Sequence, residues 1–140
     1  MNDKYVENVI KKVKYALDEE KYFYAGQSLY DLIKYGVIIG DDILVFLASE
    51  LSDVFRNCFL RVKEFEKDLD KSIITDILYN VQELLDFIIH KETSLDSETK
   101  IKIFDTLIYI ISNAERIQAQ TRDLEESKIV KRRIYRGGIS

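Results

Sequence analysis

The chain has 140 residues, of which 46% are hydrophobic and 33% are charged, and its formal net charge is −4. These values predict one ordered domain with a single hydrophobic core, and they exclude a disordered or low-complexity chain. One cysteine and one histidine exclude an internal disulfide, a thiolate cluster and a multi-histidine metal site within one copy.

Proline is absent and glycine occurs only five times. Because these two residue types interrupt helices most often, the composition favours helix along the whole chain. Apolar residues at helical spacing predict a first amphipathic helix over about residues 3–19 and a second over about residues 21–35. We expect the second helix to end at Gly36, since glycine readily adopts the left-handed turn that follows a helix.

The stretch GVIIGDD joins the second predicted helix to the third. Asp41 or Asp42 can cap the third helix by accepting a hydrogen bond from a backbone N–H. We expect Val37, Ile38 and Ile39 to pin this loop to the core.

Three further helices are predicted. The third covers about residues 42–67 and is expected to be the central helix, because its apolar face is broad. The fourth covers about residues 72–90, after the charged segment EKDLDKS. The fifth begins after KETSLDSET, a stretch rich in residues that cap helices.

The fifth helix is expected to leave the body, because nothing after Ala114 breaks it although large aliphatic residues become scarce. Its apolar residues alternate by three and four in a weak heptad-like seam that suits a second helix, and the alternative is an exposed helix that frays. The seam comprises Ile103, Leu107, Ile110, Ala114, Ile117, Thr121 and Leu124. We predict an acidic helical bundle over residues 1–117 and a C-terminal helical extension with a basic tail over residues 118–140.

Few residues suit catalysis or metal binding. Asp86 precedes His90 by four residues, so one helix face can hold a carboxylate–histidine pair. A histidine at the end of a helix, however, more often interacts with the terminal carbonyl groups and the helix dipole. The acidic string EFEKDLDKS fails as a calcium loop, since Ile73 replaces the invariant glycine and Tyr79 the bidentate glutamate. No phosphate-binding loop or nucleophile elbow occurs. We expect a protein that is not an enzyme and that needs no cofactor or metal.

The N-terminus lacks the apolar segment and cleavage site of a signal peptide. No apolar stretch approaches the roughly 18 residues that span a bilayer. We therefore expect a soluble, cytoplasmic protein without a membrane span. Cys58 lies in the apolar run VFRNCFL and is expected to be a small core residue.

Six of the nine tyrosines fall within the first 35 residues. They are expected either to line the edge of the core with their hydroxyls in water, or to form an exposed surface for a protein partner or for stacked bases. We favour the first interpretation, because base-stacking surfaces usually carry basic residues and this body is acidic. The six are Tyr5, Tyr15, Tyr22, Tyr24, Tyr30 and Tyr35.

The chain closes with SKIVKRRIYRGGIS, which has five basic residues and no acidic one. The other 16 basic residues stand against 25 acidic residues, so residues 1–126 carry a formal charge of −9. A basic tail on an acidic body is the strongest functional signal in the sequence. The candidate binding residues are Lys128, Ile129, Val130, Lys131, Arg132, Arg133, Ile134, Tyr135 and Arg136.

Four interpretations of this tail stay open. Its aliphatic residues favour docking on an acidic protein surface, including that of another copy. Its basic residues suit the phosphates of DNA or RNA, with Tyr135 available for stacking. It can also attach weakly to an anionic membrane surface, or merely complement the dipole at the end of a helix.

The sequence thus predicts an all-α fold, a four- to five-helix bundle of antiparallel hairpins with a projecting C-terminal helix. The leading hypothesis is a non-catalytic interaction or assembly protein that self-associates, or binds a protein partner, through this arm. The alternative is a small nucleic-acid-binding protein or nucleoprotein subunit whose tail contacts phosphates.

Overall fold

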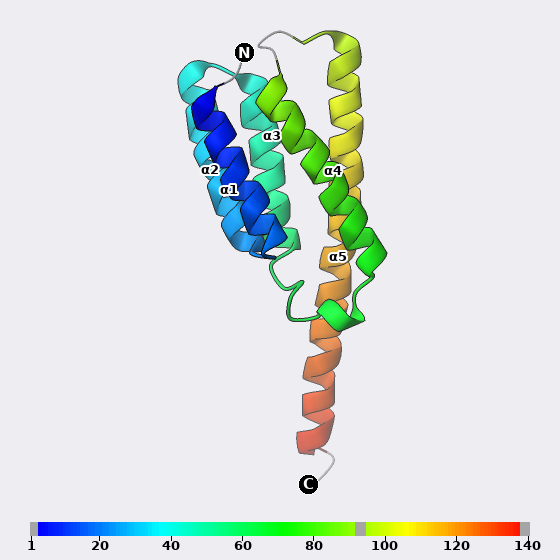
Figure 1. Ribbon diagram of the computed structural model, residues 1–140. Coiled ribbons are helices and arrows are strands. Elements are labelled where there is room, and N and C mark those ends of the chain that lie inside the picture. The colour runs from blue at the N-terminus through cyan, green and yellow to red at the C-terminus, as the bar shows by residue number, and fades with distance from the viewer. Residues whose placement is uncertain (1–2, 92–94, 138–140) are drawn as a thin grey trace.

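The computed structural model describes residues 3–91 and 95–137, with the last four of these as helical backbone only. Over this part of the chain the fold is all-α, with five helices packed together and no strand, as predicted (Figure 1). The helices are α1 (Lys4–Asp18), α2 (Tyr22–Ile39), α3 (Asp42–Asp53), α4 (Lys71–His90) and α5 (Ser97–Gly137).

The first three helices form two consecutive antiparallel hairpins in which α2 packs against both α1 and α3. The Asp3 side chain caps α1 by accepting hydrogen bonds from the backbone N–H groups of Tyr5 and Val6, at 2.9 and 3.3 Å. Asp41 caps α3 by accepting from the N–H of Leu44 at 3.1 Å. Of the two predicted caps for α3, Asp41 is therefore the one used.

The predicted end of α2 at Gly36 is wrong. Gly36 stays helical and lies so close to α3 that an added Cβ would sit 2.8 Å from a methyl carbon of Val45. The left-handed residue is Gly40, at φ 73°. The side chains of residues 37–39 are exposed, Ile38 by 80% of its surface, so the prediction that they pin a loop to the core is also wrong. Consecutive helical residues point in directions about 100° apart and cannot all face one core.

The third helix is shorter than predicted. Instead of continuing to residue 67, α3 ends at Asp53 and is followed by a π-helical turn over Val54–Cys58. A loop with a short 3₁₀ turn at Glu66–Asp68 then leads to α4. The apolar residues that suggested a helix are buried in this loop. The apolar pattern predicted correctly that these side chains are buried, but it did not determine their secondary structure. The buried residues are Phe59, Val62, Phe65 and Leu69.

An aromatic cluster closes the lower end of the bundle, where this loop begins. The Tyr22 ring lies edge-on to the Phe59 ring, with centroids 5.0 Å apart, and the Phe55 and Phe59 centroids are 5.2 Å apart. Such edge-to-face pairs add to the stabilisation that burial provides. Cys58 is buried beside this cluster, as predicted.

The last helix, α5, has 41 residues and is about 60 Å long at 1.5 Å per residue. It starts at the end of the molecule where α4 finishes, runs antiparallel to α4, and extends beyond the bundle (Figure 1). Asp96 caps the N-terminus of α5 by accepting a hydrogen bond from the backbone N–H of Thr99 at 2.7 Å. The predicted projecting C-terminal helix is therefore present.

Candidate interaction surfaces

The seam of α5 packs against the chain's own body. Ile110, Ala114 and Ile117 are fully buried, and Thr121 is 6% exposed. The covering elements are α4 and the π-helical turn, where the Cys58 thiol lies 3.8 Å from the side-chain oxygen of Gln118. The seam is thus occupied within one copy almost as far as Leu124, which is only partly buried.

Charged groups hold α5 where it leaves the body. The Arg61 guanidinium contacts Glu64 and Glu125, with N–O distances of 2.6 Å to each. Lys128 lies 3.4 Å from the other oxygen of Glu64. The hydrogen bond from Arg61 and the nearby Lys128 lower the pKa of Glu64, and the bond to Glu64 raises the pKa of Arg61. Among the candidate side chains that the structure describes, Lys128 to Arg133, Lys128 is the one that pairs with a charged group of the body.

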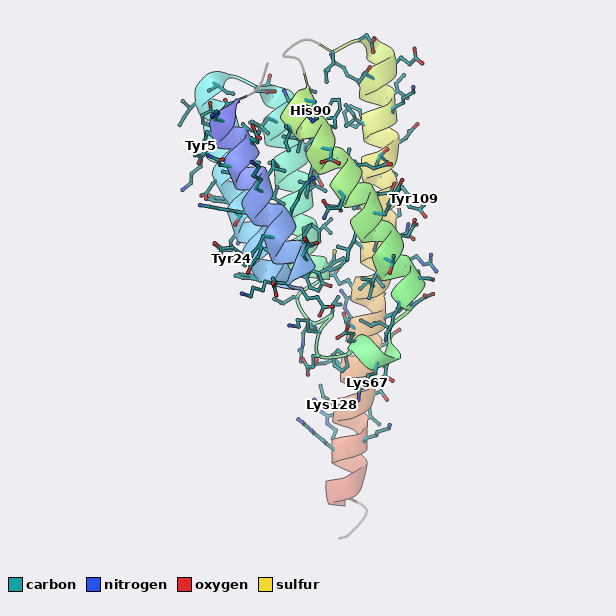
Figure 2. The ribbon with its side chains drawn as sticks, in the orientation of Figure 1. Tyr5, Tyr24, Lys67, His90, Tyr109 and Lys128 are labelled. Carbon is teal, nitrogen blue, oxygen red and sulfur yellow. The ribbon has the colours of Figure 1, made fainter. Side chains whose placement is uncertain are left out.

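Beyond this point α5 continues as an arm, residues 128–137 (Figure 2). All six candidate residues from Lys128 to Arg133 are exposed, including Ile129 by 42% and Val130 by 52% of their surfaces. The side chains of Ile134, Tyr135 and Arg136 lie outside the described residues, although their backbone is helical. The arm therefore presents aliphatic and cationic side chains together.

A second surface lies between α3 and α5, which we call the α3–α5 face. Its apolar part consists of Phe46 on α3 and Ile101, Phe104 and Ile108 on α5, all of them exposed. The Phe46 and Phe104 rings touch across the gap, with centroids 5.2 Å apart. Ile101, Phe104 and Ile108 follow one another at helical spacing, so they form one continuous apolar stripe.

The same face becomes acidic toward its lower end. Glu50 and Asp53 follow Phe46 by one and two turns of α3, and Glu115 follows Ile108 by two turns of α5. Burial, with smaller contributions from Asp53 and Glu115, raises the pKa of Cys58 to about 11. Both carboxylates therefore lie near the thiol, at the lower end of the α3–α5 face.

A third surface is a cavity of about 370 Å³ beside the turn between α1 and α2, which we call the lysine–tyrosine groove. Its lining residues are Lys11, Lys12, Tyr15, Ala16, Lys21 and Tyr24. Tyr15 is 63% and Tyr24 is 54% exposed. Figure 2 shows Tyr24 at the lower end of the α1–α2 hairpin. Lysines and tyrosines are therefore neighbours here.

The six N-terminal tyrosines do not behave as one group. Tyr22 is buried in the aromatic cluster, and Tyr35 is half-buried at the edge of the core, where its hydroxyl donates a hydrogen bond to Asp3. The other four, Tyr5, Tyr15, Tyr24 and Tyr30, are exposed. The interpretation that all six line the core edge is too simple, because they fall on different faces of their helices.

The structure does not pair Asp86 with His90, the carboxylate–histidine candidate for catalysis or metal binding. Asp86 pairs with the Lys14 ammonium group of α1, and no hydrogen bond joins it to His90 among the described residues. His90 is the last residue of α4 and is exposed at the opposite end of the molecule from the arm (Figure 2). In the acidic string, Asp70 caps α4 by accepting from the N–H of Ser72 at 3.0 Å.

Sequence reasoning missed two of the three surfaces. For the lysine–tyrosine groove a local signal exists, because Lys11 and Lys12 precede Tyr15 by four and three positions on α1 and are therefore both its neighbours on the helix surface. The α3–α5 face has no such signal, since Phe46 and Phe104 are 58 positions apart in the sequence.

Comparison of the chain with protein-family models, with curated proteins and with solved structures found no match. Within residues 3–91 and 95–137, no helix combines the length and apolar character that crossing a membrane requires. Inferences about function therefore rest on the three surfaces.

Proposed function

We propose that the chain is a non-catalytic assembly protein that self-associates by docking the arm of one copy on the α3–α5 face of another. The observation that carries this proposal is the exposure of Ile129 and Val130 on a helix that has already left its own body. The seam of α5 is occupied within the copy, so the arm, and not the seam, is free to dock on another copy.

The lack of packing around the arm supports a partner for it. Nine residues extend about 14 Å beyond the contact between Lys128 and Glu64. The arm continues a packed helix and needs no nucleus of its own, but most helical stability in proteins comes from tertiary packing of an apolar face. A partner that covers Ile129 and Val130 provides this packing.

The α3–α5 face complements the arm in both hydrophobicity and charge. Phe46, Phe104 and Ile108 offer an exposed apolar surface, and Glu50, Asp53 and Glu115 lie next to it. The arm brings exposed Ile129 and Val130 beside four described cations, Lys128, Lys131, Arg132 and Arg133. From Ile101 to Glu115 the face extends about 21 Å along α5, long enough for the arm.

Because the arm and the α3–α5 face are two different surfaces, docking can produce either of two kinds of assembly. If two copies exchange arms reciprocally, a closed dimer forms, whereas docking in one direction extends a chain of copies. The chain has a mass of 16.5 kDa, so light scattering distinguishes a monomer, a dimer and a longer assembly.

The test compares the full chain with a chain ending at Glu126, by light scattering over a concentration series. We expect the full chain to exceed the monomer mass and the truncated chain to be monomeric. Ile129→Ser should weaken association, whereas Ile38→Ser, which changes an isoleucine exposed on α2, should leave it unchanged. Arg133→Glu should weaken association, and Glu115→Arg in the same chain should restore part of it.

Other outcomes separate this proposal from its alternatives. A full chain that stays monomeric at the highest concentration overturns self-association. If truncation leaves the mass unchanged but abolishes binding to DNA or RNA, the arm is a nucleic-acid contact. If Phe104→Ser leaves association intact while Ile129→Ser removes it, the arm docks elsewhere on the partner copy.

A further inference from the structure

The lysine–tyrosine groove is a cationic site on an acidic body. Three of its lining residues are lysines, whereas residues 1–126 as a whole carry −9. Lys11 lies 3.4 Å from Glu7, but among the described residues neither Lys12 nor Lys21 takes part in an ion pair. The three acidic residues of the adjacent turn, Asp18, Glu19 and Glu20, do not line this groove.

Exposed aromatic rings accompany these lysines. Tyr15 and Tyr24 both line the groove, and both expose more than half of their surface. A cationic track with aromatic rings is the arrangement that binds unpaired nucleic acid, because the ammonium groups contact phosphates and the rings stack on bases. An acidic body disfavours base stacking, but Tyr15 and Tyr24 do have basic neighbours in this groove.

A neighbouring groove extends the track. It has a volume of about 420 Å³, shares Lys21 and Tyr24 with the first groove, and adds the exposed side chains of Phe23, Leu60 and Lys63. Glu20 is the acidic residue that lines it. Together the two grooves offer a further aromatic ring and a fourth lysine along one continuous path.

We propose that this double groove binds single-stranded DNA or RNA, with the lysines contacting phosphates and Tyr15, Tyr24 and Phe23 stacking on bases. This site is separate from the arm and does not depend on self-association. Single strands fit better than duplexes, because only unpaired bases expose faces on which these rings can stack. Binding without sequence preference is expected, since stacking and phosphate contacts do not read base edges.

The test measures fluorescence anisotropy of labelled oligothymidine and oligouridine with the full chain over a salt series. We expect Lys12→Ala/Lys21→Ala to weaken binding by about tenfold or more at low salt and to flatten the salt dependence. The matched control, Lys71→Ala/Lys102→Ala, removes the same charge from exposed lysines of α4 and α5 and should change affinity by less than about twofold.

A second pair of variants tests stacking separately from charge. Tyr15→Leu/Tyr24→Leu retains all lysines, so binding should fall by about tenfold while the salt dependence stays the same. Both tyrosines are largely exposed, so the variants should fold like the wild type. Their light-scattering masses should equal that of the wild type, which separates this proposal from the one for the arm.

Three results overturn the proposal. The first is no binding of either oligonucleotide by the full chain at low salt. The second is equal loss of affinity in the lysine variant and its control, or loss only on truncation after Glu126, which assigns binding to general charge or to the arm. The third is equally tight binding of polyglutamate or of a duplex, which removes the role of stacking.

Discussion

The Tyr35 hydroxyl of α2 donates a hydrogen bond to the carboxylate of Asp3, the residue that caps α1. The two helices are joined at this end by one carboxylate that also accepts from the N–H groups of Tyr5 and Val6. The Tyr5 and Tyr35 rings also pack against each other, with centroids 4.6 Å apart. The bond from Tyr35 is the main cause of a lowered Asp3 pKa, and it raises the pKa of Tyr35.

This contact predicts a loss of stability in acid. Because the folded-state pKa of Asp3 lies below its ordinary value of 3.8, its stabilising contribution is present above that value and is lost as pH falls through the folded pKa. Asp3→Ala should cost about 1 kcal/mol at pH 7, and the difference from the wild type should shrink below about pH 4. Urea unfolding at several pH values measures this.

The control for this prediction is Tyr30→Phe, which removes the hydroxyl of an exposed tyrosine on the same helix. It should leave the acid dependence unchanged, whereas Tyr35→Phe should reduce it. An Asp3→Ala penalty that is the same at pH 3 and pH 7 would contradict the proposed role of the ionised carboxylate.

Gly26→Ala is predicted to destabilise the protein, although glycine to alanine in a helix normally stabilises by up to about 1 kcal/mol. The added Cβ would lie 2.5 Å from Cγ of Arg56 and 3.0 Å from the backbone oxygen of Ser52. It would also disturb the hydrogen bond that the Ser52 hydroxyl donates to the Gly26 carbonyl at 2.7 Å. We expect a loss of about 1–3 kcal/mol in urea unfolding.

Ser52→Ala provides the comparison. It removes only the hydroxyl, and should cost about 1 kcal/mol because the Gly26 carbonyl keeps its place in the helix. If Gly26→Ala proves neutral or stabilising, α2 and α3 are not in close contact at this position.

Two isoleucines of α5 are predicted to differ in their effect on stability. Ile117 is fully buried in the seam, so Ile117→Ala should lower the free energy of unfolding by about 2–5 kcal/mol. Ile129 lies on the arm and is 42% exposed, so Ile129→Ala should change it by less than about 0.5 kcal/mol in the monomer. Both are measured at low concentration. Equal effects would mean that α5 does not leave the body where we place it.

The Cys58 thiol is predicted to react slowly. Burial raises its pKa to about 11, so at pH 8 only about one thiol in a thousand is ionised. A thiol-specific reagent such as Ellman's reagent should therefore modify the native chain far more slowly than the chain in urea. The rate for the native chain should rise with pH toward 11. Rapid modification of the folded protein at pH 8 would show that the thiol is accessible.

The sequence by itself determined the all-α class, the burial of Cys58 and the continuation of α5 beyond the body. It also narrowed the fold to four or five helices and the cap of α3 to Asp41 or Asp42. These features depend on local properties, namely helical periodicity, scarce helix breakers and capping side chains. The charge contrast between body and tail, which made the arm a candidate, is also a local property.

Only the tertiary structure decided where α2 and α3 end and what covers the seam of α5. Gly36 remains helical because α3 packs directly on it, and Phe59 is buried by a loop where periodicity alone suggested a helix. The contact of Phe46 with Phe104, and the convergence of Lys21 and Tyr24 with lysines of α1, exist only once helices pack. Both surfaces require side chains from different elements to meet, and no local pattern in the sequence specifies such a meeting.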